Sequence, residues 1–337
     1  MQNKKYFITK IGIKNISIYL MGKLKQIPLI SVLDAGRRFA SKGYPNYHQS
    51  YFDKQQWKII FYTLFNPRFA SKWFTLLKSP NFSFVFIHRP RLYIKPFRPY
   101  ISIKWNKKQK VKVILDTYRF IKSKGETFTQ LLTHNEDKII AHLVFNNTYE
   151  GFLKLGYDDR FRKEGELVLS LECSQLGGKI ISVAFSFEEI KKGRWVCLIG
   201  CVQGQSINTQ HSSKLAQKLM FGLRPNSFII FSAQELSRQL GCTAIYGVGD
   251  SIQAYRKKHT IHLPWVHKIH FNYDKFWYEV GGQNIGEGWF ELPLIPVLKN
   301  IQEIKSNKRS MYRNRYHMLD NLSLKISNSV KALLEIS

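Results

Sequence analysis

Residues 165–204 read GELVLSLECSQLGGKIISVAFSFEEIKKGRWVCLIGCVQG, and this stretch decides the fold class. It holds three runs rich in β-branched and aromatic residues, separated by glycine-containing pairs at 177–178 and 192–193, where hairpin turns are expected. Leucines alternate with Val, Ser and Glu over 167–172, as in a half-buried strand. With GFLKLGYDD (151–159) before it, the stretch predicts an antiparallel β-meander of three or four strands.

Helical spacing follows the meander. INTQHSSKLAQKLMF (207–221) predicts one helix and NSFIIFSAQELSRQLG (226–241) a second, with apolar residues at spacings of 4, 3 and 4. Pro225 suits the first turn of the second helix, and Gly241 suits the position just past its end. CTAIYGVG (242–249) then predicts a short interior strand. A strand, helix and strand connected in this way form a parallel crossover. The predicted fold class is therefore α+β, with a mixed sheet.

The region before the meander is predicted to be helical and extended. Residues 52–78 have helical spacing interrupted at Pro67, which predicts a pair of helices. Residues 84–103 contain three prolines and predict extended edge segments. VKVILDTYRFIK (111–122) returns to helical spacing.

These patterns divide the chain into four parts. We predict a basic N-terminal segment at 1–50, a helical and extended accessory region at 51–150, an α+β core domain at 151–300 and a C-terminal basic-aromatic helix at 301–337. With 337 residues, 44% of them apolar, the chain can bury a substantial core. This composition excludes disorder as a description of the whole chain.

The charge is strongly positive and unevenly distributed. The chain has 52 Lys+Arg against 23 Asp+Glu, and residues 1–110 hold 22 of the basic residues with only Asp34 and Asp53 as acids. Such a charge attracts polyanions such as nucleic acid or acidic lipid headgroups, although a Lys-rich composition typical of an AT-rich genome would give part of it. No apolar run reaches the roughly 18 residues of a membrane-spanning helix, and the N-terminus lacks the apolar stretch of a signal peptide. We therefore predict a cytoplasmic protein, peripheral to the inner membrane, without a transmembrane segment.

No metal site is predicted. The cysteines are Cys173, Cys197, Cys201 and Cys242. They form no CxxC motif, so we expect buried, reduced thiols. Cys197 and Cys201 are four apart on a predicted strand and should face the same side. Four histidines crowd 259–270, but Pro264 breaks any continuous helix there, so a solvated loop or edge strand is expected.

Polar residues at the predicted ends of elements form the candidate ligand site. They are Gln203, Gly204, Lys218, Arg224, Tyr273, Asp274 and Trp277. Small ligands are usually held where strand ends meet helix starts, and the Arg224 guanidinium matches a phosphate or carboxylate. We expect residues 203–204, Arg224 and the 273–282 turn to converge on one concavity. Asp274 and Glu279 are five apart and predict no acid–base pair, so no catalytic residue is predicted and enzymatic activity stays open.

KSNKRSMYRNRYHMLDNL (305–322) predicts a helix that mixes cations with tyrosines. Its anion-binding candidates are Lys308, Arg309, Arg313 and Arg315. Such a mixture of cations and aromatic rings can bind either nucleic-acid bases or lipid headgroups. A solvated amphipathic helix that covers the sheet is the alternative, and the sequence leaves both open.

Several segments resemble, in the same order, the signature segments of the bacterial VirK/YbjX family. They are IGCVQG (199–204), KLMFGLRPNSFIIFSAQELSRQLG (218–241), YDKFWYEVGG (273–282) followed by GWFELP, and KRSMYRNRYHMLD (308–320). The resemblance covers roughly residues 50–322, and Gln217 and Phe221 depart from it where Thr and His are usual. It implies a Gram-negative accessory protein linked to virulence, antimicrobial-peptide resistance and stress including DNA damage, without established chemistry.

The order of meander, helix, strand, helix and strand also resembles the N-acetyltransferase (GNAT) fold. In that fold the acyl-CoA pyrophosphate sits on a [QR]xxGx[GA] loop at the start of the central helix. Here the corresponding residues are RPNSFI (224–229), without glycine. No cofactor is predicted on this basis, and acyl-CoA is kept as an alternative.

The two resemblances imply two functions, and the charge distribution adds a third. The first is an accessory protein of the bacterial envelope or stress response that binds an anionic partner at the inner membrane surface. The second is an acyl- or aminoacyl-transferase with a degenerate GNAT core. The third is non-specific binding of nucleic acid through the basic N-terminal third.

Overall fold

The computed structural model describes residues 49–133, 136–204, 210–256 and 271–335. The chain divides into two compact units, Met1–Arg98 and Pro99–Ser337. Most of the basic N-terminal segment and the histidines of 259–270 lie outside the described residues. Within the described ranges, no helix combines the length and the apolar character needed to cross a membrane.

The described part of the first unit is helical. It contains α3 (Gln49–Phe65), α4 (Pro67–Leu77), α5 (Ser83–His88) and the 3₁₀ helix η1 (Pro90–Phe97). Pro67 is the first residue of α4, where its missing N–H removes no hydrogen bond. The predicted helix pair with a break at Pro67 is thereby confirmed.

The extended segments predicted over 84–103 are wrong for most of that range, which forms α5 and η1. Pro90 occupies the first position of η1, and the φ of proline suits a 3₁₀ turn as well as an extended segment. Trp73 of α4 holds this turn in place, because its indole Nε1–H lies 3.3 Å from the Leu92 carbonyl and 3.2 Å from that of Tyr93. Pro90 and Pro96 therefore lie within a short helix, whereas Pro99 follows its end.

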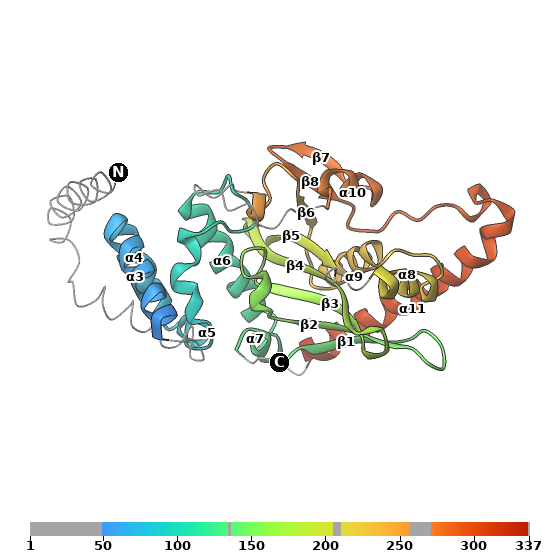
Figure 1. The fold of residues 1–337 in the computed structure, drawn as a ribbon, viewed down its shortest axis with the longest axis horizontal. Helices are drawn as coiled ribbons and strands as arrows, with labels where there is room; N and C mark the ends of the chain where they lie inside the picture. The colour runs from blue at the N-terminus through green and yellow to red at the C-terminus, as the bar shows by residue number, and fades with distance from the viewer. Residues whose placement is uncertain (1–48, 134–135, 205–209, 257–270, 336–337) are drawn as a thin grey trace, which may run out of the picture. The chain divides into compact units, whose positions relative to one another are not determined.

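The second unit is built around one eight-stranded sheet (Figure 1). Its strands are β1 (Lys138–Val144), β2 (Glu150–Gly156), β3 (Leu167–Cys173), β4 (Gly178–Lys191), β5 (Arg194–Gly204), β6 (Ala244–Val248), β7 (Gln283–Gly286) and β8 (Trp289–Leu292). The spatial order is β1-β2-β3-β4-β5-β6-β8-β7, and all neighbours are antiparallel except β5 and β6, which are parallel. The predicted meander, crossover and mixed sheet are confirmed. The sheet begins at β1, which precedes the predicted start of the core at residue 151.

Helices complete this unit. They are α6 (Lys107–Lys122), α7 (Glu126–Thr133), α8 (Gln210–Leu219), α9 (Pro225–Gln239), α10 (Tyr273–Glu279) and α11 (Ser306–Glu335). The crossover helix α9 packs on β3, β4 and β5, and α11 packs on α9 and β1. Asn106 caps α6, since its side chain accepts the Gln109 N–H while the Gln109 side chain accepts that of Asn106.

Strand β3 is buried on both faces, so the predicted half-buried strand is wrong. The alternation of Leu with polar residues suggested a solvated face, but Ser170 is only 2% exposed. Its hydroxyl pairs with that of Ser182 on β4 at 2.8 Å. A paired hydroxyl can be buried at little cost, which is why the polar position faces the interior.

Helix α6 continues the hydrogen bonding of β4 beyond the end of β3. The last β3–β4 pair is Leu167 with Phe185, so the later residues of β4 have no strand beside them there. The Thr117 hydroxyl accepts the Phe187 N–H at 2.9 Å and lies 3.0 Å from the Phe187 carbonyl. The Asp116 carboxylate accepts the next outward-facing N–H, that of Glu189, at 3.1 Å. Side chains of a helix thus replace two rungs of the ladder.

We expect Thr117→Val to destabilise the protein by about 1–3 kcal/mol, because the buried Phe187 N–H would lose its acceptor. Urea denaturation followed by circular dichroism measures the effect. Thr129→Val is the matched control, since the Thr129 hydroxyl bonds only to the Gly125 carbonyl of its own helical turn, which the Thr129 N–H also reaches. Equal losses in the two variants would contradict the role given to α6.

Candidate functional site

Strands β5 and β6 separate toward their carboxyl ends. They pair only from Val196 with Ala244 to Ile199 with Gly247, while β5 continues to Gly204. A bulge in β5 lies at Gly200, where a Cβ would collide with the Glu164 carbonyl oxygen. Among the described strands, none therefore pairs with the end of β5 on its β6 side.

The bulge places Cys197 and Cys201 on opposite faces of the sheet, so the prediction that they face the same side is wrong. The period of two along a strand is interrupted by the extra residue. The Cys197 thiol hydrogen-bonds Ser237 of α9, whereas the Cys201 thiol hydrogen-bonds the Glu164 carboxyl. Burial raises the pKa of both thiols, which keeps them protonated and unreactive.

Helix α10 closes the gap between the separating strands. The Tyr273 hydroxyl accepts the Val202 N–H at 3.2 Å and donates to the Val202 carbonyl at 3.3 Å. The Trp277 indole N–H donates to the Val248 carbonyl at 2.7 Å. Both side chains are buried, so these two predicted site residues use their polar atoms to satisfy the ends of β5 and β6.

The other predicted ligand residues lie around this closed gap. Asp274 accepts the Asp250 N–H at 2.7 Å and so fixes the turn after β6. Arg224, which precedes α9, forms an ion pair with Glu279 of α10 at 2.7 Å. The structure thus brings Arg224 to α10. Gln203 and Gly204 are exposed at the end of β5, and Lys218 is exposed on α8. Their convergence on one concavity stays a prediction.

A buried carboxyl group, which the sequence did not reveal, lies behind the β5 bulge. Glu164 is 4% exposed; it accepts a hydrogen bond from Gln253 Nε2 at 2.9 Å and another from the Cys201 thiol. Burial raises the pKa of the Glu164 carboxyl to about 7, against the opposing effect of these hydrogen bonds. In sequence, the charged stretch around Gly165 resembles a surface loop. Gly165 is the signal that this stretch packs closely on the sheet, because there is no room for a Cβ at this position.

A second buried carboxylate, Glu166, anchors a cluster of hydroxyl groups. Tyr118 donates to it at 2.7 Å, and the Glu166 N–H donates to Ser186 Oγ at 3.1 Å. Ser186 Oγ also lies 2.8 Å from the Tyr100 hydroxyl. Burial and the nearby Glu166 carboxylate raise the pKa of Tyr100 and Tyr118 well above the usual range of tyrosine. The hydroxyl groups of this cluster are buried, hydrogen-bonded and kept protonated by their raised pKa values. We therefore assign the cluster a structural role in the core and no catalytic role.

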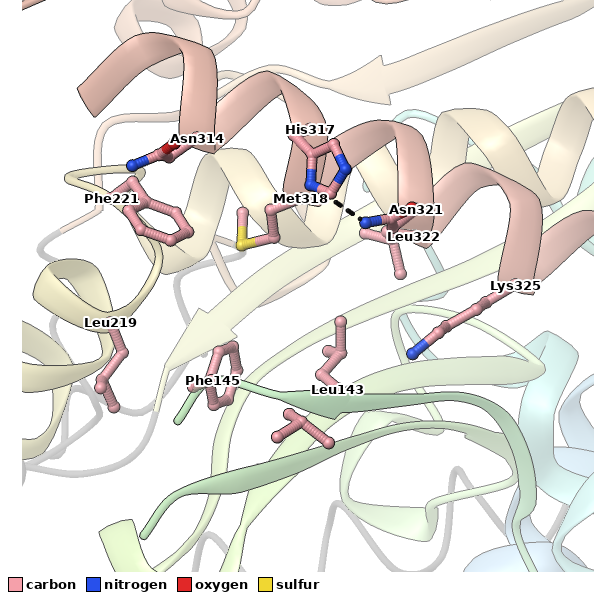
Figure 2. A pocket seen from close by; sticks show the side chains of 11 residues that line it. Leu143, Phe145, Leu219, Phe221, Asn314, His317, Met318, Asn321, Leu322 and Lys325 are labelled. Atoms are coloured by element: carbon pink, nitrogen blue, oxygen red, sulfur yellow. Dashed lines mark hydrogen bonds between the residues drawn. The ribbon is translucent and has the colours of Figure 1, made fainter. Parts of the chain in front are cut away.

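A cavity of about 260 Å³ opens between the end of β1, the turn after α8, and α11. Figure 2 shows Met318 and Leu322 of α11 pointing toward Leu143 and Phe145 at the end of β1. Phe221 contributes another apolar wall from the α8–α9 turn. The remaining lining residues of α11 are polar: Asn314, His317, Asn321 and Lys325.

Phe221 is held in a backbone conformation that L-residues rarely adopt, with φ at 51°. Arg315 of α11 fixes it, because its Nε and Nη2 donate to the Phe221 carbonyl at 3.1 and 2.7 Å. The following Gly222 also has a positive φ, of 77°, and its carbonyl accepts a hydrogen bond from the Gln217 side chain. A strained residue held by several contacts is typical of a functional surface.

The four anion-binding candidates of α11 divide into two pairs. Arg315 binds the Phe221 carbonyl and lies 4.0 Å over the Tyr312 ring. Arg309 donates to the carbonyls of Ile304 and Gln302 at 2.9 and 3.0 Å. These two guanidinium groups brace the main chain. Lys308 and Arg313, by contrast, are exposed. Among the described residues, no group of three or more His, Cys, Asp or Glu side chains could hold a metal ion.

We expect Glu164→Gln to remove a pH dependence of stability. The folded pKa of about 7 exceeds the ordinary value of 4.5, so the folded protein binds more protons between these values. Its contribution is therefore favourable below about pH 4.5, falls as the pH rises to about 7 and is flat above, a total change of about 3 kcal/mol. Urea midpoints at pH 5 and pH 8 measure it. Glu303→Gln, at an exposed carboxylate, should keep the wild-type slope; a Glu164→Gln variant with that same slope would refute the expectation.

Comparison with known proteins places the chain in a family. The model of the family described as "Protein of unknown function (DUF535)" matches residues 49–328. The "Uncharacterized protein YbjX" of Escherichia coli (strain K12) is 28% identical over 267 residues, which are 78% of this chain and 79% of that protein. An "Uncharacterized protein" of Haemophilus influenzae (strain ATCC 51907 / DSM 11121 / KW20 / Rd) is 30% identical over 65% of this chain and 70% of its own length. No solved structure matches. Since the family match covers well over half of the chain, the protein belongs to the DUF535 family, the VirK/YbjX family that its signature segments predicted.

Proposed function

We propose that the protein is an accessory protein of the bacterial envelope and stress response that docks on an anionic membrane surface. The docking surface consists of the loop 293–300 and the first turns of α11. Its apolar members are Ile295, Val297 and Leu298, and its cations are Lys299, Lys305, Lys308 and Arg313. The observation that carries the proposal is this exposed apolar loop beside exposed cations.

The apolar loop is exposed and yet firmly held. Ile295 is 72% exposed and Val297 76% exposed, in a segment that leads from β8 to α11 (Figure 1). At its start, Gln234 of α9 donates to the Pro293 carbonyl at 2.7 Å. At its end, the Tyr316 hydroxyl donates to the Lys299 carbonyl at 2.8 Å. A loop fixed at both ends can enter an interface with little loss of conformational entropy.

The charge around the loop favours an anionic bilayer. Residues 293–316 hold six Lys/Arg and one acid, Glu303. Four exposed cations near such a bilayer contribute about 1 kcal/mol each, which alone gives only a millimolar affinity. The aliphatic side chains of the loop add about 1.5–3 kcal/mol each when they are fully buried. Cations and loop together would therefore reach the affinity of a peripheral membrane protein.

The tyrosines of α11 favour lipid over nucleic acid as the partner. Single-stranded nucleic acid binds to exposed aromatic rings on which bases stack. Here the Arg315 guanidinium covers the Tyr312 ring, and Tyr312 packs edge-on against Tyr316 at 5.9 Å between ring centroids. The surface thus offers aliphatic groups and cations rather than free rings.

Helix α3 of the first unit supports the same kind of partner independently. Trp57, Phe61 and Phe65 follow one another at spacings of four and are 61%, 50% and 42% exposed. Lys54, one turn earlier, is exposed as well. Exposed Trp and Phe side chains near a lysine suit the interfacial region of a membrane.

We expect the full chain to bind vesicles of phosphatidylglycerol and phosphatidylcholine and not vesicles of phosphatidylcholine alone. Replacing Lys308→Gln and Arg313→Gln together should weaken the binding roughly thirty-fold, since each cation contributes about 1 kcal/mol. Replacing Val297→Ser and Leu298→Ser together should weaken it at least as much. Flotation of protein with vesicles at physiological salt measures both.

The matched control is the pair Lys191→Gln and Lys192→Gln, two exposed cations at the β4–β5 hairpin, which should keep binding within about three-fold because they lie outside the docking surface. Equal retention on both kinds of vesicle, or an equal loss in the control, would refute the proposal. Stronger binding to duplex DNA than to vesicles at the same salt would favour nucleic acid instead.

An acyltransferase is the second candidate, and the order of elements favours it. The meander, the crossover helix between parallel β5 and β6, the short α10 and the last strand pair follow the order of the GNAT resemblance. An acyl-CoA bound along β5 would have to pair with its free end. Tyr273 already holds the Val202 N–H and carbonyl there, so the observed packing weighs against such a cofactor.

We expect acetyl-CoA and longer acyl-CoA thioesters to leave the Tm of the protein unchanged, because the Val202 main chain is already bonded. Differential scanning fluorimetry over a concentration series checks this. The Tyr273→Phe variant, which lacks the hydroxyl, is the companion measurement. A dose-dependent rise in Tm for the wild type would restore the acyltransferase as the leading candidate.

A further inference from the structure

We infer that the cavity between β1, the α8–α9 turn and α11 binds a medium-chain carboxylate, an apolar chain with one anionic end. This inference does not rest on the docking surface, because the cavity is lined by other residues. Three features carry it: the two-sided chemistry of the lining, the size of the cavity and the rigid construction of its wall.

The lining is apolar on one side and donates hydrogen bonds on the other. The apolar walls include Leu143, Phe145 and Met318. The polar side comes from one face of α11, and no carboxylate lines the cavity. A ligand with a hydrocarbon body and an anionic head complements both parts.

The polar groups of α11 are set to donate. The Asn321 amide N–H₂ lies 3.2 Å from His317 Nδ1, and an amide nitrogen can only donate, so Nδ1 accepts and the imidazole carries its proton on Nε2 (Figure 2). Lys325 Nζ donates to the His142 carbonyl at 2.6 Å, which uses one of its three N–H groups. The two remaining N–H groups of the Lys325 ammonium are thus available for an anionic head.

The size of the cavity sets the length of the chain. At about 260 Å³ the cavity is slightly smaller than the roughly 300–1,000 Å³ of a typical small-molecule pocket. An octanoyl or decanoyl chain therefore suits it better than a hexadecanoyl chain.

The wall is pre-formed. Phe221 lines the cavity in its strained conformation, and Arg315 holds its carbonyl through two hydrogen bonds. A Cβ at Gly222 would approach Arg315 Nη2 to 3.0 Å, so the glycine leaves room for the Arg315 guanidinium beside the turn. A wall fixed in this way does not need to be ordered by the ligand, which favours binding.

The test is a titration of the full chain, labelled with ¹³C at its methionine methyl groups, with decanoate below its micellar concentration. We expect the Met318 methyl signal, assigned from Met318→Leu, to shift saturably. Decanol and decyltrimethylammonium, which lack the anionic head, should bind at least ten-fold more weakly. Octanoate should bind within a few-fold of decanoate, and hexadecanoate should gain little over it.

Two variants locate the site. Met318→Trp fills the cavity, and Lys325→Gln removes the ammonium group; each should weaken decanoate binding at least ten-fold in calorimetry. Leu324→Ala is the control on the same helix, because Leu324 is 62% exposed and lies outside the lining. Should Met318→Trp fail to fold, Lys325→Gln and the methyl titration decide the question alone.

Absence of a Met318 shift at saturating decanoate would overturn the inference. So would equal affinity for decanol and decanoate, since the polar face of α11 would then have no part in binding. Vesicle flotation of Met318→Trp separates the two proposals: the variant should lose decanoate binding and keep membrane binding.

Discussion

Two glycines, Gly165 and Gly200, allow the close crossing on which the sheet domain depends. A Cβ at Gly200 would collide with the Glu164 carbonyl, and one at Gly165 would collide with the main chain of Phe185. Because the chain passes so near to β4 and β5, the residues beside these glycines cannot reach solvent. Glu164 and Glu166 are consequently buried. Gln253 and Cys201 hydrogen-bond to the Glu164 carboxyl group, and Tyr118 hydrogen-bonds to that of Glu166. The polar core of the domain is a result of this main-chain geometry.

Helix α11 has two functionally different halves. Its buried residues, Leu319, Leu322, Ile326 and Val330, all lie from the middle of the 30-residue helix onward and recur at spacings of three and four. That half packs on α9 and β1. The first half is largely exposed and is braced by Arg309 and Arg315, which reach back to main-chain carbonyls. One rigid element therefore carries both the exposed cations and the polar face of the cavity.

Local patterns predicted the parts of the fold that local chemistry determines. Pro67 breaks a helix, and the apolar stripe of α9 with Pro225 and Gly241 at its ends marks a helix wherever it packs. Strand β1 was not predicted, because its exposed Ile139 and Val144 disturb the alternation of apolar and polar residues. The cavity could not be predicted for a different reason. Its lining comes from three segments distant in sequence, and the positive φ of Phe221 depends on an arginine 94 residues later. The hydrogen bonds from Arg309 and Arg315 to main-chain carbonyls could not be predicted either, because in sequence these two arginines do not differ from exposed ones.

The first strand of the sheet has a consequence for how copies of this chain meet in solution. An edge strand with exposed Ile139 and Val144 is a template onto which another chain can add a strand and start aggregation. On β1 the pairing register is shifted between Ile139 and Ala141, and Lys325 already occupies the His142 carbonyl. A second copy could not extend the sheet here without displacing an ammonium group from its acceptor. The same lysine that faces the cavity thereby hinders strand addition at the β1 edge of the sheet.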